Sequence, residues 1–280
     1  MLRLKKRNLL RVTALVAILI ITLTACGTGT ESTNSGQSSE SGTKSDVLLV
    51  GVDDNYPPME FKDSDGKTTI GFDVDVAKEL GKRLGKSDVQ FVSNDWTGIF
   101  QALEINKFDA IISSVSINEE RQKEHSLTKP YIANKQVIVT KKSTTDIKST
   151  DDLNGKKVGL QAGSTSEDFC RDLIKNKKMV ENDMSTYPLV TQPFMDLDAG
   201  RLDAVICDIV VAKYYIANNK DKYTLTWESA DAEPMALCFK KKDTELRDKA
   251  NQILDDMQAD GTMKKISEKW FGEDVTKNLQ

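Results

Sequence analysis

A related segment occurs twice in this sequence, and the repeat limits the folds open to the chain. Phe100–Ser114 (FQALEINKFDAIISS) aligns with Phe194–Asp208 (FMDLDAGRLDAVICD), with coincident Phe, Leu, Asp and Ala positions. Each copy predicts one helix, a tight turn at Asn106 or Gly200, and one buried strand, since both turn residues tolerate the left-handed conformation. The match preserves the whole pattern of helix, turn and strand, which a chance similarity would not be expected to do. We therefore expect two related lobes.

Short apolar runs alternate with helical patterns along the body of the chain. We expect strands at Val47–Val52, Ala110–Val115, Gln136–Thr140, Lys157–Leu160, Ala204–Ile206 and Met235–Phe239. We expect helices at Asp73–Leu84, Thr97–Asn106, Thr165–Lys175, Gln192–Ala199 and Thr244–Asp260. The strand runs are apolar on both faces, as in sheets that helices cover on both sides. The alternation predicts an α/β fold with mostly parallel sheets.

The first 25 residues have the pattern of an export signal. A basic segment precedes the apolar run Thr13–Thr24, and Ala25 and Cys26 follow. As a helix that run rises only about 18 Å, too short for a bilayer core of about 30 Å. An uncleaved membrane anchor is the alternative. Leu23-Thr24-Ala25-Cys26 resembles the bacterial lipobox, which predicts a lipoprotein signal peptide over 1–25 and acylation of Cys26 by a fatty acid such as palmitate.

The segment after Cys26 predicts a flexible tether. Fourteen of the nineteen residues in Gly27–Ser45 are Gly, Ser or Thr, a composition that cannot bury a core. Its mean span is roughly 24 Å, enough to hold a globular body clear of lipid headgroups. Residues 26–45 are therefore expected to tie the protein to a membrane by its N-terminal lipid.

The charge balance and the histidine count exclude several functions. The chain has 39 Lys and Arg against 43 Asp and Glu, and residues 1–25 hold five of the bases and no acid. That leaves 34 bases against 43 acids in the rest of the chain, a surface unsuited to nucleic acid. With His125 as the single histidine, a multi-His metal centre is excluded, and we expect neither a metal nor a cofactor.

Three cysteines follow Cys26, and an odd number cannot all pair within the chain. We favour three buried thiols. The alternative is a single bridge between two of them, with Cys170–Cys207 as the first pairing to consider and Cys238 left free. A Cys–His nucleophile would need His125. That residue lies in the charged stretch EERQKEHS and is expected at a solvated helix end, so we do not expect thiol catalysis.

Polar residues stand where the predicted strands end. Ser114 and Asp208 occupy equivalent ends in the two copies of the repeat, and Asp53 and Gln161 end a weaker matching pair, LLVGVDD and KKVGLQA. Ligands of open parallel sheets bind beyond the carboxyl ends of the strands. Two lobes that face each other through these ends would form a cleft lined by hydrogen-bond donors and acceptors, the default place for a binding site.

The body, over roughly residues 46–275, resembles the family 3 extracellular solute-binding proteins of bacteria, the polar amino-acid receptors of ABC importers. Its most specific piece is GFDVDVAKELGKRL (Gly71–Leu84). Further matching segments, in the same order and spacing, are VGVDDNYPPMEF (Val50–Phe61), DWTGIFQAL (Asp95–Leu103), FDAIISSVSINEER (Phe108–Arg121), TKPY (Thr128–Tyr131), DLNGKKVGLQAGST (Asp152–Thr165) and DAGRLDAVICD (Asp198–Asp208).

The resemblance implies a type II periplasmic-binding-protein fold, with two lobes joined by a two-strand hinge. Residues 46–134 would start lobe 1, residues 135–230 would form lobe 2, and residues 231–280 would return to lobe 1. It also implies a monomeric receptor, not an enzyme, that delivers a free amino acid to an ABC permease. The protein would act outside the cytoplasm, anchored by its lipid to the outer face of the cell membrane, or in the periplasm of a cell with an outer membrane.

The resemblance also implies which residues hold the ligand. A zwitterion needs guanidinium and N–H donors for its carboxylate, and a carboxylate and a carbonyl for its ammonium. Arg121 with Ser116 would take the carboxylate, together with Ser164 and Thr165 at a helix N-terminus, and Asp208 with Ser114 would take the ammonium. Side-chain recognition is expected from a further set: Asp53, Tyr56, Trp96, Ser113 and Gln161.

This set favours a cationic ligand. Asp53 supplies a carboxylate, and an aromatic face attracts a guanidinium by about 0.5–2 kcal/mol. Arginine, lysine, histidine or ornithine therefore come first. Glutamine or cystine follows, because Gln161 is a neutral donor and acceptor, and an acidic ligand comes last. Asp73 and Asp75 are expected to be structural, as a helix cap and a solvated charge.

Two rival functions use the same fold. An exported dehydratase would need a catalytic acid in the cleft, for which Glu60 or Glu119 are the candidates. A sensor or an adhesin would bind a ligand without taking part in uptake. Recovery of the ligand unchanged argues against the first rival, and loss of uptake on deletion argues against the second.

Overall fold

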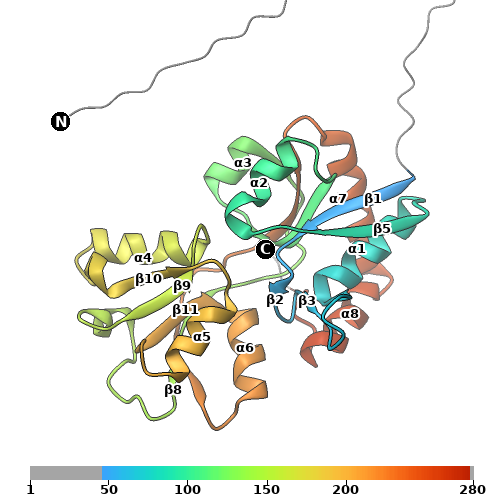
Figure 1. Ribbon diagram of the computed structural model, residues 1–280. Coiled ribbons are helices and arrows are strands. Elements are labelled where there is room, and N and C mark those ends of the chain that lie inside the picture. The colour runs from blue at the N-terminus through green and yellow to red at the C-terminus, as the bar shows by residue number, and fades with distance from the viewer. Residues whose placement is uncertain (1–45, 278–280) are drawn as a thin grey trace, which may run out of the picture. The chain divides into compact units, whose positions relative to one another are not determined.

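The computed structural model describes residues 46–277, which belong to one compact unit (Figure 1). The predicted signal peptide, Cys26 and the tether lie outside the described residues. Two five-stranded sheets, each with helices on both faces, form two lobes. None of the helices in the described part of the chain has the length and apolar character that crossing a membrane requires.

The first lobe is built on the sheet β5-β1-β6-β13-β7. β5, β1 and β6 are parallel, and β13 runs against both of its neighbours, β6 and β7. One strand of five is therefore reversed, so the sheet is mostly parallel, as predicted. The strands are β1 (Val47–Val52), β5 (Asp88–Ser93), β6 (Ala110–Ser116), β7 (His125–Leu127) and β13 (Met235–Lys240).

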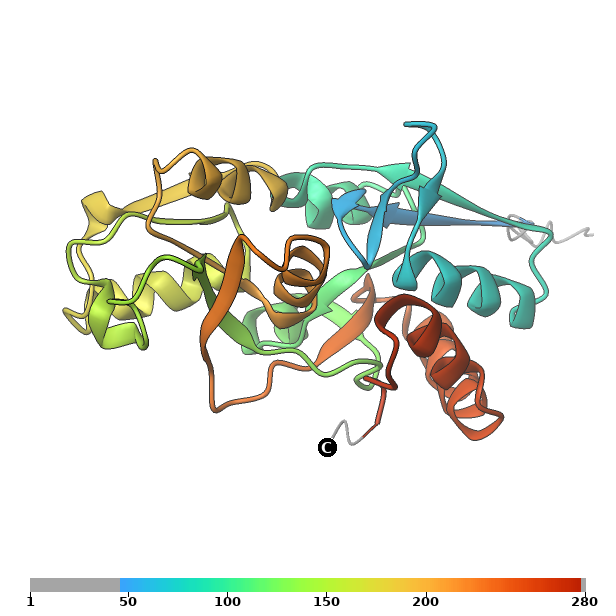
Figure 2. The same cartoon turned by 90° about the horizontal axis from the view of Figure 1, so that it is seen from below.

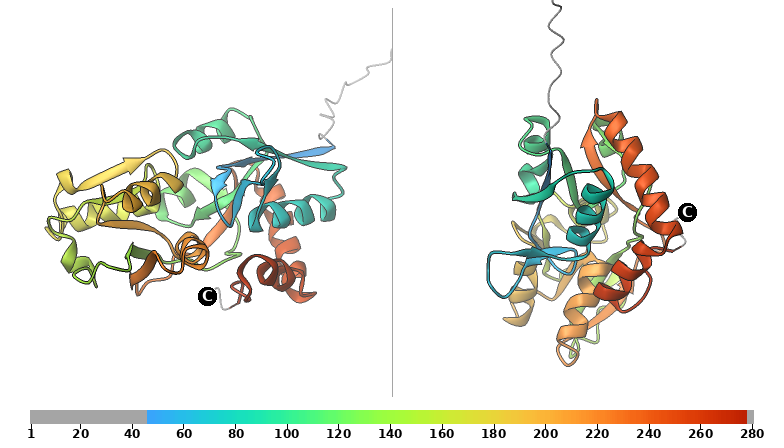
Figure 3. Two further views of the ribbon diagram at one scale, coloured as in Figure 1. Left: turned by 60° about the horizontal axis from the view of Figure 1, so that its bottom comes forward. Right: turned by 90° about the vertical axis from the view of Figure 1, so that its right-hand side faces the viewer.

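Successive residues of these strands bury alternate faces against different helices. Ala110 and Ile112 pack in the core under α1, α7 and α8, whereas Ile111 and Val115 pack under α2. In Figure 3, α7 and α8 lie along one side of this lobe, and both contact α1. The helices are α1 (Phe72–Arg83), α2 (Trp96–Glu104), α3 (Glu119–Glu124), α7 (Thr244–Ala259) and α8 (Thr262–Phe271).

The second lobe repeats this plan with the sheet β10-β9-β11-β8-β12. β10, β9 and β11 are parallel and β8 is reversed. α4 covers one face through Cys170 and Leu173, and α5 and α6 cover the other. The elements are β8 (Gln136–Lys141), β9 (Val158–Gln161), α4 (Thr165–Lys175), β10 (Met184–Tyr187), α5 (Thr191–Asp198), β11 (Ala204–Asp208), α6 (Ile209–Asn218) and β12 (Tyr223–Glu228).

Two adjacent backbone segments connect the lobes. Asn134 and Glu233 exchange backbone hydrogen bonds of 3.2 and 2.8 Å, and Ile132 pairs with Met235. One segment leads into β8 and the other into β13, the reversed strand of each sheet. In Figure 2 the second lobe, mostly yellow to orange, lies on the left, and the first lobe, with the C-terminal helices in red, lies on the right.

The fold class and the predicted elements are confirmed. Each predicted strand and helix is present, with ends that differ by one or two residues. The sequence analysis did not predict the outer strands β5, β7, β10 and β12, the helices α3, α6 and α8, or a small sheet beside the first. That small sheet contains β2 (Asn55–Tyr56), β3 (Glu60–Lys62) and β4 (Thr69–Ile70).

Several residues lie elsewhere than predicted. Gly71, not Asp73, is the N-cap of α1, and Asp73 is fully buried within the helix. Asp75 is not a solvated charge, because it accepts hydrogen bonds from Lys269 and Trp270. The side chain of His125 is 6% exposed and stacks on a phenylalanine ring, so its solvated position was predicted wrongly.

All three cysteines of the described residues are buried and unpaired. The favoured expectation of three buried thiols is therefore confirmed, and the alternative bridge between Cys170 and Cys207 does not form. Burial raises the pKa of Cys170 to about 12, which keeps this thiol protonated and unreactive at neutral pH.

Candidate functional site

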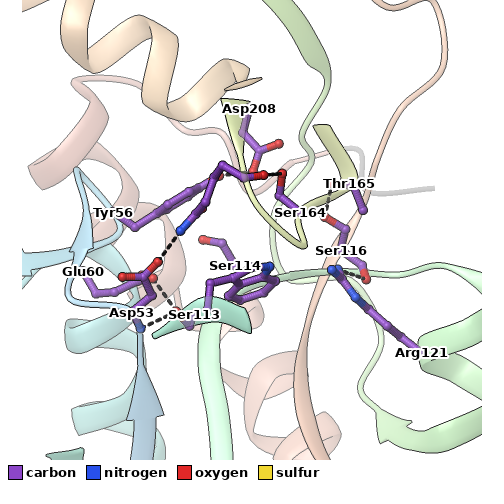
Figure 4. Close-up of a pocket in the computed structure, with 12 residues that line it drawn as sticks. Asp53, Tyr56, Glu60, Ser113, Ser114, Ser116, Arg121, Ser164, Thr165 and Asp208 are labelled. Carbon is purple, nitrogen blue, oxygen red and sulfur yellow. Dashed lines mark hydrogen bonds between the residues drawn. The ribbon is translucent and has the colours of Figure 1, made fainter. Parts of the chain in front are cut away.

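A cavity lies between the ends of the two sheets (Figure 4), with about 290 Å³ of empty space when the solvent at its mouth is included. All the ligand-binding residues predicted from the sequence line it, and one residue outside that prediction, Glu60, lines it too. The predicted residues are Asp53, Tyr56, Trp96, Ser113, Ser114, Ser116, Arg121, Gln161, Ser164, Thr165 and Asp208.

The strand ends bring these residues together, as the repeat predicts. Gln161 ends β9 and Asp208 ends β11 in the second lobe, whereas Asp53 follows β1 in the first. The Nε2 of Gln161 donates a hydrogen bond of 2.6 Å to the Oδ2 of Asp53. This equivalent pair therefore meets directly across the cleft.

A local distortion of β6 shapes the cavity wall. Ser114 has a positive φ of 52°, and the pairing of β6 with β13 shifts register at this point. A non-glycine residue in this region needs local support. Asp73 supplies it: Oδ2 accepts hydrogen bonds from the backbone N–H of Ser114 at 2.8 Å and from its hydroxyl at 3.2 Å. Asp73 is therefore a positioning residue, not a helix cap.

Arg121 provides a buried positive charge at one end of the cavity. The Asn118 side chain caps α3 and accepts from the Arg121 backbone N–H at 2.8 Å, which fixes the start of the turn that carries the guanidinium. Nη1 donates to the Ser116 carbonyl at 3.0 Å, and the guanidinium lies 5.3 Å from the Trp96 ring centre. Among residues 46–277 no carboxylate forms an ion pair with Arg121, so its remaining N–H groups are suited to an anion.

The N-terminus of α4 adds donors at the same end. Ser164 is the N-cap of this helix, and its side chain accepts from the Glu167 backbone N–H. The hydroxyl of Thr165, the first residue of α4, lies 3.5 Å from the hydroxyl of Ser116 in the opposite lobe. Unpaired backbone N–H groups and the helix dipole favour a carboxylate here.

Asp208 provides the buried negative charge. It occupies the N-cap position of α6, but its side chain makes no cap hydrogen bond and turns into the cavity. Oδ2 accepts from the Tyr56 hydroxyl and Oδ1 accepts from Gln136 Nε2 at 2.7 Å. Burial, and then the nearby charge of Glu233, raise the pKa of Asp208 to about 7. A cation bound here would restore the ionised form.

The far end of the cavity holds a second acidic group. Asp53 is 2% exposed, and burial raises its pKa to about 6 although the Gln161 amide opposes that rise. Its backbone N–H donates to Ser113 Oγ at 3.0 Å, and that hydroxyl donates to Glu60 Oε1 at 2.5 Å. This end therefore suits a ligand group that donates hydrogen bonds or carries positive charge.

The two lobes touch each other across the cavity. Trp96 Nε1 donates to the Gly163 carbonyl at 2.8 Å, and the pairs Asp53–Gln161 and Tyr56–Asp208 also bridge the cleft. Each pair joins one lobe to the other, so the cleft is closed in this structure.

Two residues near the cavity carried no usable sequence signal. Glu60 stands in a stretch of mixed polar and apolar residues, VGVDDNYPPMEF, and was considered only as a catalytic acid for a rival function. Gln136, at the start of β8, donates both to Asp208 and, at 2.6 Å, to Glu233 Oε2. Glutamine and glutamate in these positions look like ordinary surface residues until the fold buries them.

Within the described residues, no group of three or more His, Cys, Asp or Glu side chains is arranged to hold a metal ion. The chemistry of the cavity is instead that of charge pairing and hydrogen bonding. The cavity presents the Arg121 guanidinium beside the N-terminus of α4, the carboxyl group of Asp208, and the carboxyl group of Asp53 beside the Gln161 amide.

Comparison with known proteins gives one family. Residues 48–273 match the model of the bacterial extracellular solute-binding proteins, family 3. The chain is 35% identical over 232 residues to the L-cystine-binding protein TcyJ of Escherichia coli (strain K12), a match that covers 82% of this chain and 85% of that protein.

Solved structures agree with this match. An ancestral arginine-binding protein bound to arginine is 39% identical, has a TM-score of 0.76, and is matched over 81% of this chain and 99% of that chain. The ancestral amino acid-binding protein AncCDT-1, a precursor of cyclohexadienyl dehydratase, is 37% identical with a TM-score of 0.74, over 81% of this chain and 96% of that chain.

Proposed function

The chain belongs to the bacterial extracellular solute-binding proteins of family 3, and from this premise we propose that it captures a free polar L-amino acid and delivers it to the permease of an ABC transporter. One observation carries the proposal. One closed cavity contains a buried guanidinium, Arg121, which forms no ion pair within residues 46–277, and, among its buried carboxyl groups, Asp208 and Asp53. These three groups complement the three charges of a cationic amino acid.

The α-carboxylate and the α-ammonium of the ligand account for one half of the site. Its α-carboxylate pairs with Arg121 and with the N-terminus of α4 at Ser164 and Thr165. Its α-ammonium pairs with Asp208, which draws the pKa of that carboxyl back toward its ordinary value. Ser114 and Ser116 supply further polar atoms between the two.

The side chain of the ligand accounts for the other half. A guanidinium or an ammonium would lie against Asp53 and between the aromatic rings of Tyr56 and Trp96. We therefore propose a cationic amino acid, with arginine first, in keeping with the arginine-bound relative. Glutamine or cystine is the second candidate, because Gln161 and the hydroxyl of Ser113 serve a neutral polar group equally well, and TcyJ is named for cystine.

Ligand binding and lobe closure are the same event in this mechanism. Arg121 and Asp53 belong to the first lobe, whereas Thr165 and Asp208 belong to the second. Only the closed form satisfies all charges of one ligand, so the ligand shifts the equilibrium towards closure. The closed, loaded form is then the form presented to the permease.

Thermal-shift and calorimetric titrations test the function. The purified protein is titrated with the twenty amino acids, ornithine and cystine. A ligand that binds only the native state stabilises it by about 2.7 kcal/mol at one hundred times its dissociation constant. We expect a cationic amino acid to give the largest shift. Tight binding of glutamate without a response to arginine would overturn the assignment of Asp53, and no response to any amino acid would overturn the receptor function.

We also propose that the receptor works as a monomer held at the cell surface by a lipid on Cys26. The support is the lipobox-like sequence Leu23–Cys26 and the Ser/Thr/Gly tether. Replacing Cys26 with alanine should release the protein from membranes or leave the signal uncleaved, since each buried CH₂ of the anchor contributes about 0.8 kcal/mol. A Cys26→Ala protein that is still processed and membrane-bound would contradict the anchor.

A receptor returns its ligand chemically unchanged, whereas an exported dehydratase does not. Glu119, one of the two acids considered for that rival, is exposed on α3 and does not line the cavity. Glu60 does line it, and AncCDT-1 is a precursor of a dehydratase. Incubation followed by mass spectrometry of the ligand distinguishes the two functions, and we expect full recovery.

A further inference from the structure

Three buried carboxyl groups gather at the side-chain end of the cavity. Asp53, Glu60 and Asp73 are 2%, 1% and 0% exposed. In the part of the chain that the structure describes, no lysine or arginine forms an ion pair with any of them. Three ionised carboxylates packed together in a low-dielectric interior repel each other strongly, so some of this charge must be neutralised.

The surroundings of Glu60 favour a protonated carboxyl group. Oε1 accepts from Ser113 Oγ at 2.5 Å, and Oε2 is buried and receives no N–H or O–H from the described residues. A buried carboxylate oxygen without a donor is costly to keep charged, and the charge of the nearby Asp73 carboxyl group adds to that cost. A proton on Glu60 removes both costs.

Glu60 is the member of the pair that holds it. Asp73 accepts three hydrogen bonds, two from Ser114 and one of 2.6 Å from the Tyr131 hydroxyl. Glu60 accepts only one, so its ionised form is the less stabilised. Burial raises the pKa of Glu60 well above its usual range, and the charge of Asp73 raises it further; the pKa of Asp73 reaches only about 6.

The titratable groups that face Glu60 come from four elements. Asp53 lies after β1 and Asp73 in α1, and two tyrosines complete the surroundings, Tyr56 in β2 and Tyr131 after β7. Burial raises the pKa of both phenols well above 10, so they stay neutral. The surroundings therefore contain negative and neutral groups, and a positive charge can enter only with a ligand.

We propose that Glu60 is a further recognition residue of the pocket, which holds a proton against Asp73 while the pocket is empty and ionises when a cationic ligand side chain enters. This inference rests on the proposed function. Glu60 lines the cavity beside Asp53 and Ser113, as Figure 4 shows. On ionisation the O–H bond of Glu60 breaks, the proton passes to solvent, and the carboxylate accepts hydrogen bonds from the ligand cation.

The change in protonation of Glu60 adapts the pocket to the charge of its ligand. A cationic side chain meets two carboxylates, those of Asp53 and Glu60, whereas a neutral amide meets one carboxylate and one carboxylic acid that can donate. Binding of a cation should therefore release more protons than binding of a neutral amino acid of similar shape. Asp208 adds a proton release common to both kinds of ligand, because every amino acid brings it an ammonium.

Calorimetry counts these protons. L-Arginine is titrated into the purified protein at pH 7.5 in phosphate and in Tris, which differ in ionisation enthalpy, and the neutral isostere L-citrulline and glutamine are titrated alongside. Glu60→Gln keeps the size and the Ser113 contact but cannot ionise. Glu119→Gln, an exposed glutamate on α3, is the matched control. We expect the extra release with arginine in the wild type and in Glu119→Gln, and its loss in Glu60→Gln.

Infrared difference spectroscopy on the wild type gives a second readout that needs no variant. Arginine should remove the C=O band of a protonated carboxyl group beyond the loss that citrulline or glutamine causes. Unchanged proton release in Glu60→Gln, or no extra release and no extra band loss in the wild type, would overturn the role of Glu60. Binding of neutral amino acids alone would also overturn it and leave the receptor function standing. Only failure to bind any amino acid would overturn the proposed function itself.

Discussion

Replacing Asp208 with asparagine should weaken ligand binding and, without ligand, favour the closed cleft. The rise of the Asp208 pKa from 3.8 to about 7 means that keeping its charge in the closed, empty cavity costs about 4 kcal/mol. The amide has nearly the same shape and its one oxygen can still accept from Tyr56 or from Gln136, but it carries no charge. The variant therefore closes without the cost of burying this charge, and it also lacks the carboxylate that pairs with the ligand ammonium.

The expected loss of affinity follows from the unpaired ammonium. Removing one member of a buried, hydrogen-bonded charge pair costs about 2–5 kcal/mol, which corresponds to a dissociation constant raised between about 30-fold and about 5,000-fold. Calorimetry with the tightest ligand measures it. Asp231→Asn, an exposed aspartate on the return segment between the lobes, is the control and should bind as the wild type does.

The charge of Asp208 also makes the equilibrium between the open and the closed ligand-free protein depend on pH. Because the pKa of Asp208 is raised in the closed form, that form binds more protons than the open one. Acid should therefore favour the closed, ligand-free protein as pH falls from about 7 towards about 4, and this dependence should shrink in Asp208→Asn. Small-angle scattering without ligand measures compactness. Unchanged affinity would remove Asp208 from the site, and a more open ligand-free variant would refute the electrostatic argument.

Three other perturbations have defined outcomes. Trp96→Phe keeps the aromatic ring but loses the N–H bond to Gly163, about 1 kcal/mol, so calorimetry should show roughly fivefold weaker binding; equal affinity would argue against this closing contact. Affinity for a cationic ligand should fall as pH drops below about 6, because Asp53 must first lose its proton, and the fall should be smaller in Asp53→Asn; an identical pH profile would contradict this. Gly51→Ala should destabilise the protein by about 1–3 kcal/mol, because the new Cβ would lie 2.4 Å from the Phe108 ring, and an unchanged melting curve would contradict that packing.

The sequence was sufficient for the architecture because the buried strands are apolar on both faces. β1, β6 and β11 lie inside their sheets, and each begins with a run of apolar residues. The outer strands β5 and β12 are half exposed, with a composition closer to that of loops. Nothing local distinguishes such a strand until its neighbour in the sheet is known.

The site was predictable where the repeat and the strand ends defined it, and not where burial changes the meaning of a residue. Asp53 and Gln161 come from equivalent strand ends, and the structure joins them by a hydrogen bond. Asp73 begins an amphipathic pattern, as a helix cap would, and only the tertiary contact with Ser114 gives its role. Glu60 is two residues from an exposed lysine side chain, and whether it is charged depends on packing that no local pattern encodes.

The course of β13 has a consequence for the way the chain acquires its structure. β13 lies between β6 and β7 in the first sheet, although the whole second sheet separates it from them along the chain. The second sheet uses only residues 136–228, so it can form while the first still lacks one of its inner strands, β13. We expect that closing the long loop from β7 to β13 carries the larger entropic barrier and is the slow step of folding. A chain emerging N-terminus first would therefore expose the edges of β6 and β7 until residue 240 arrives, and this is the period when a holding chaperone has a surface to bind.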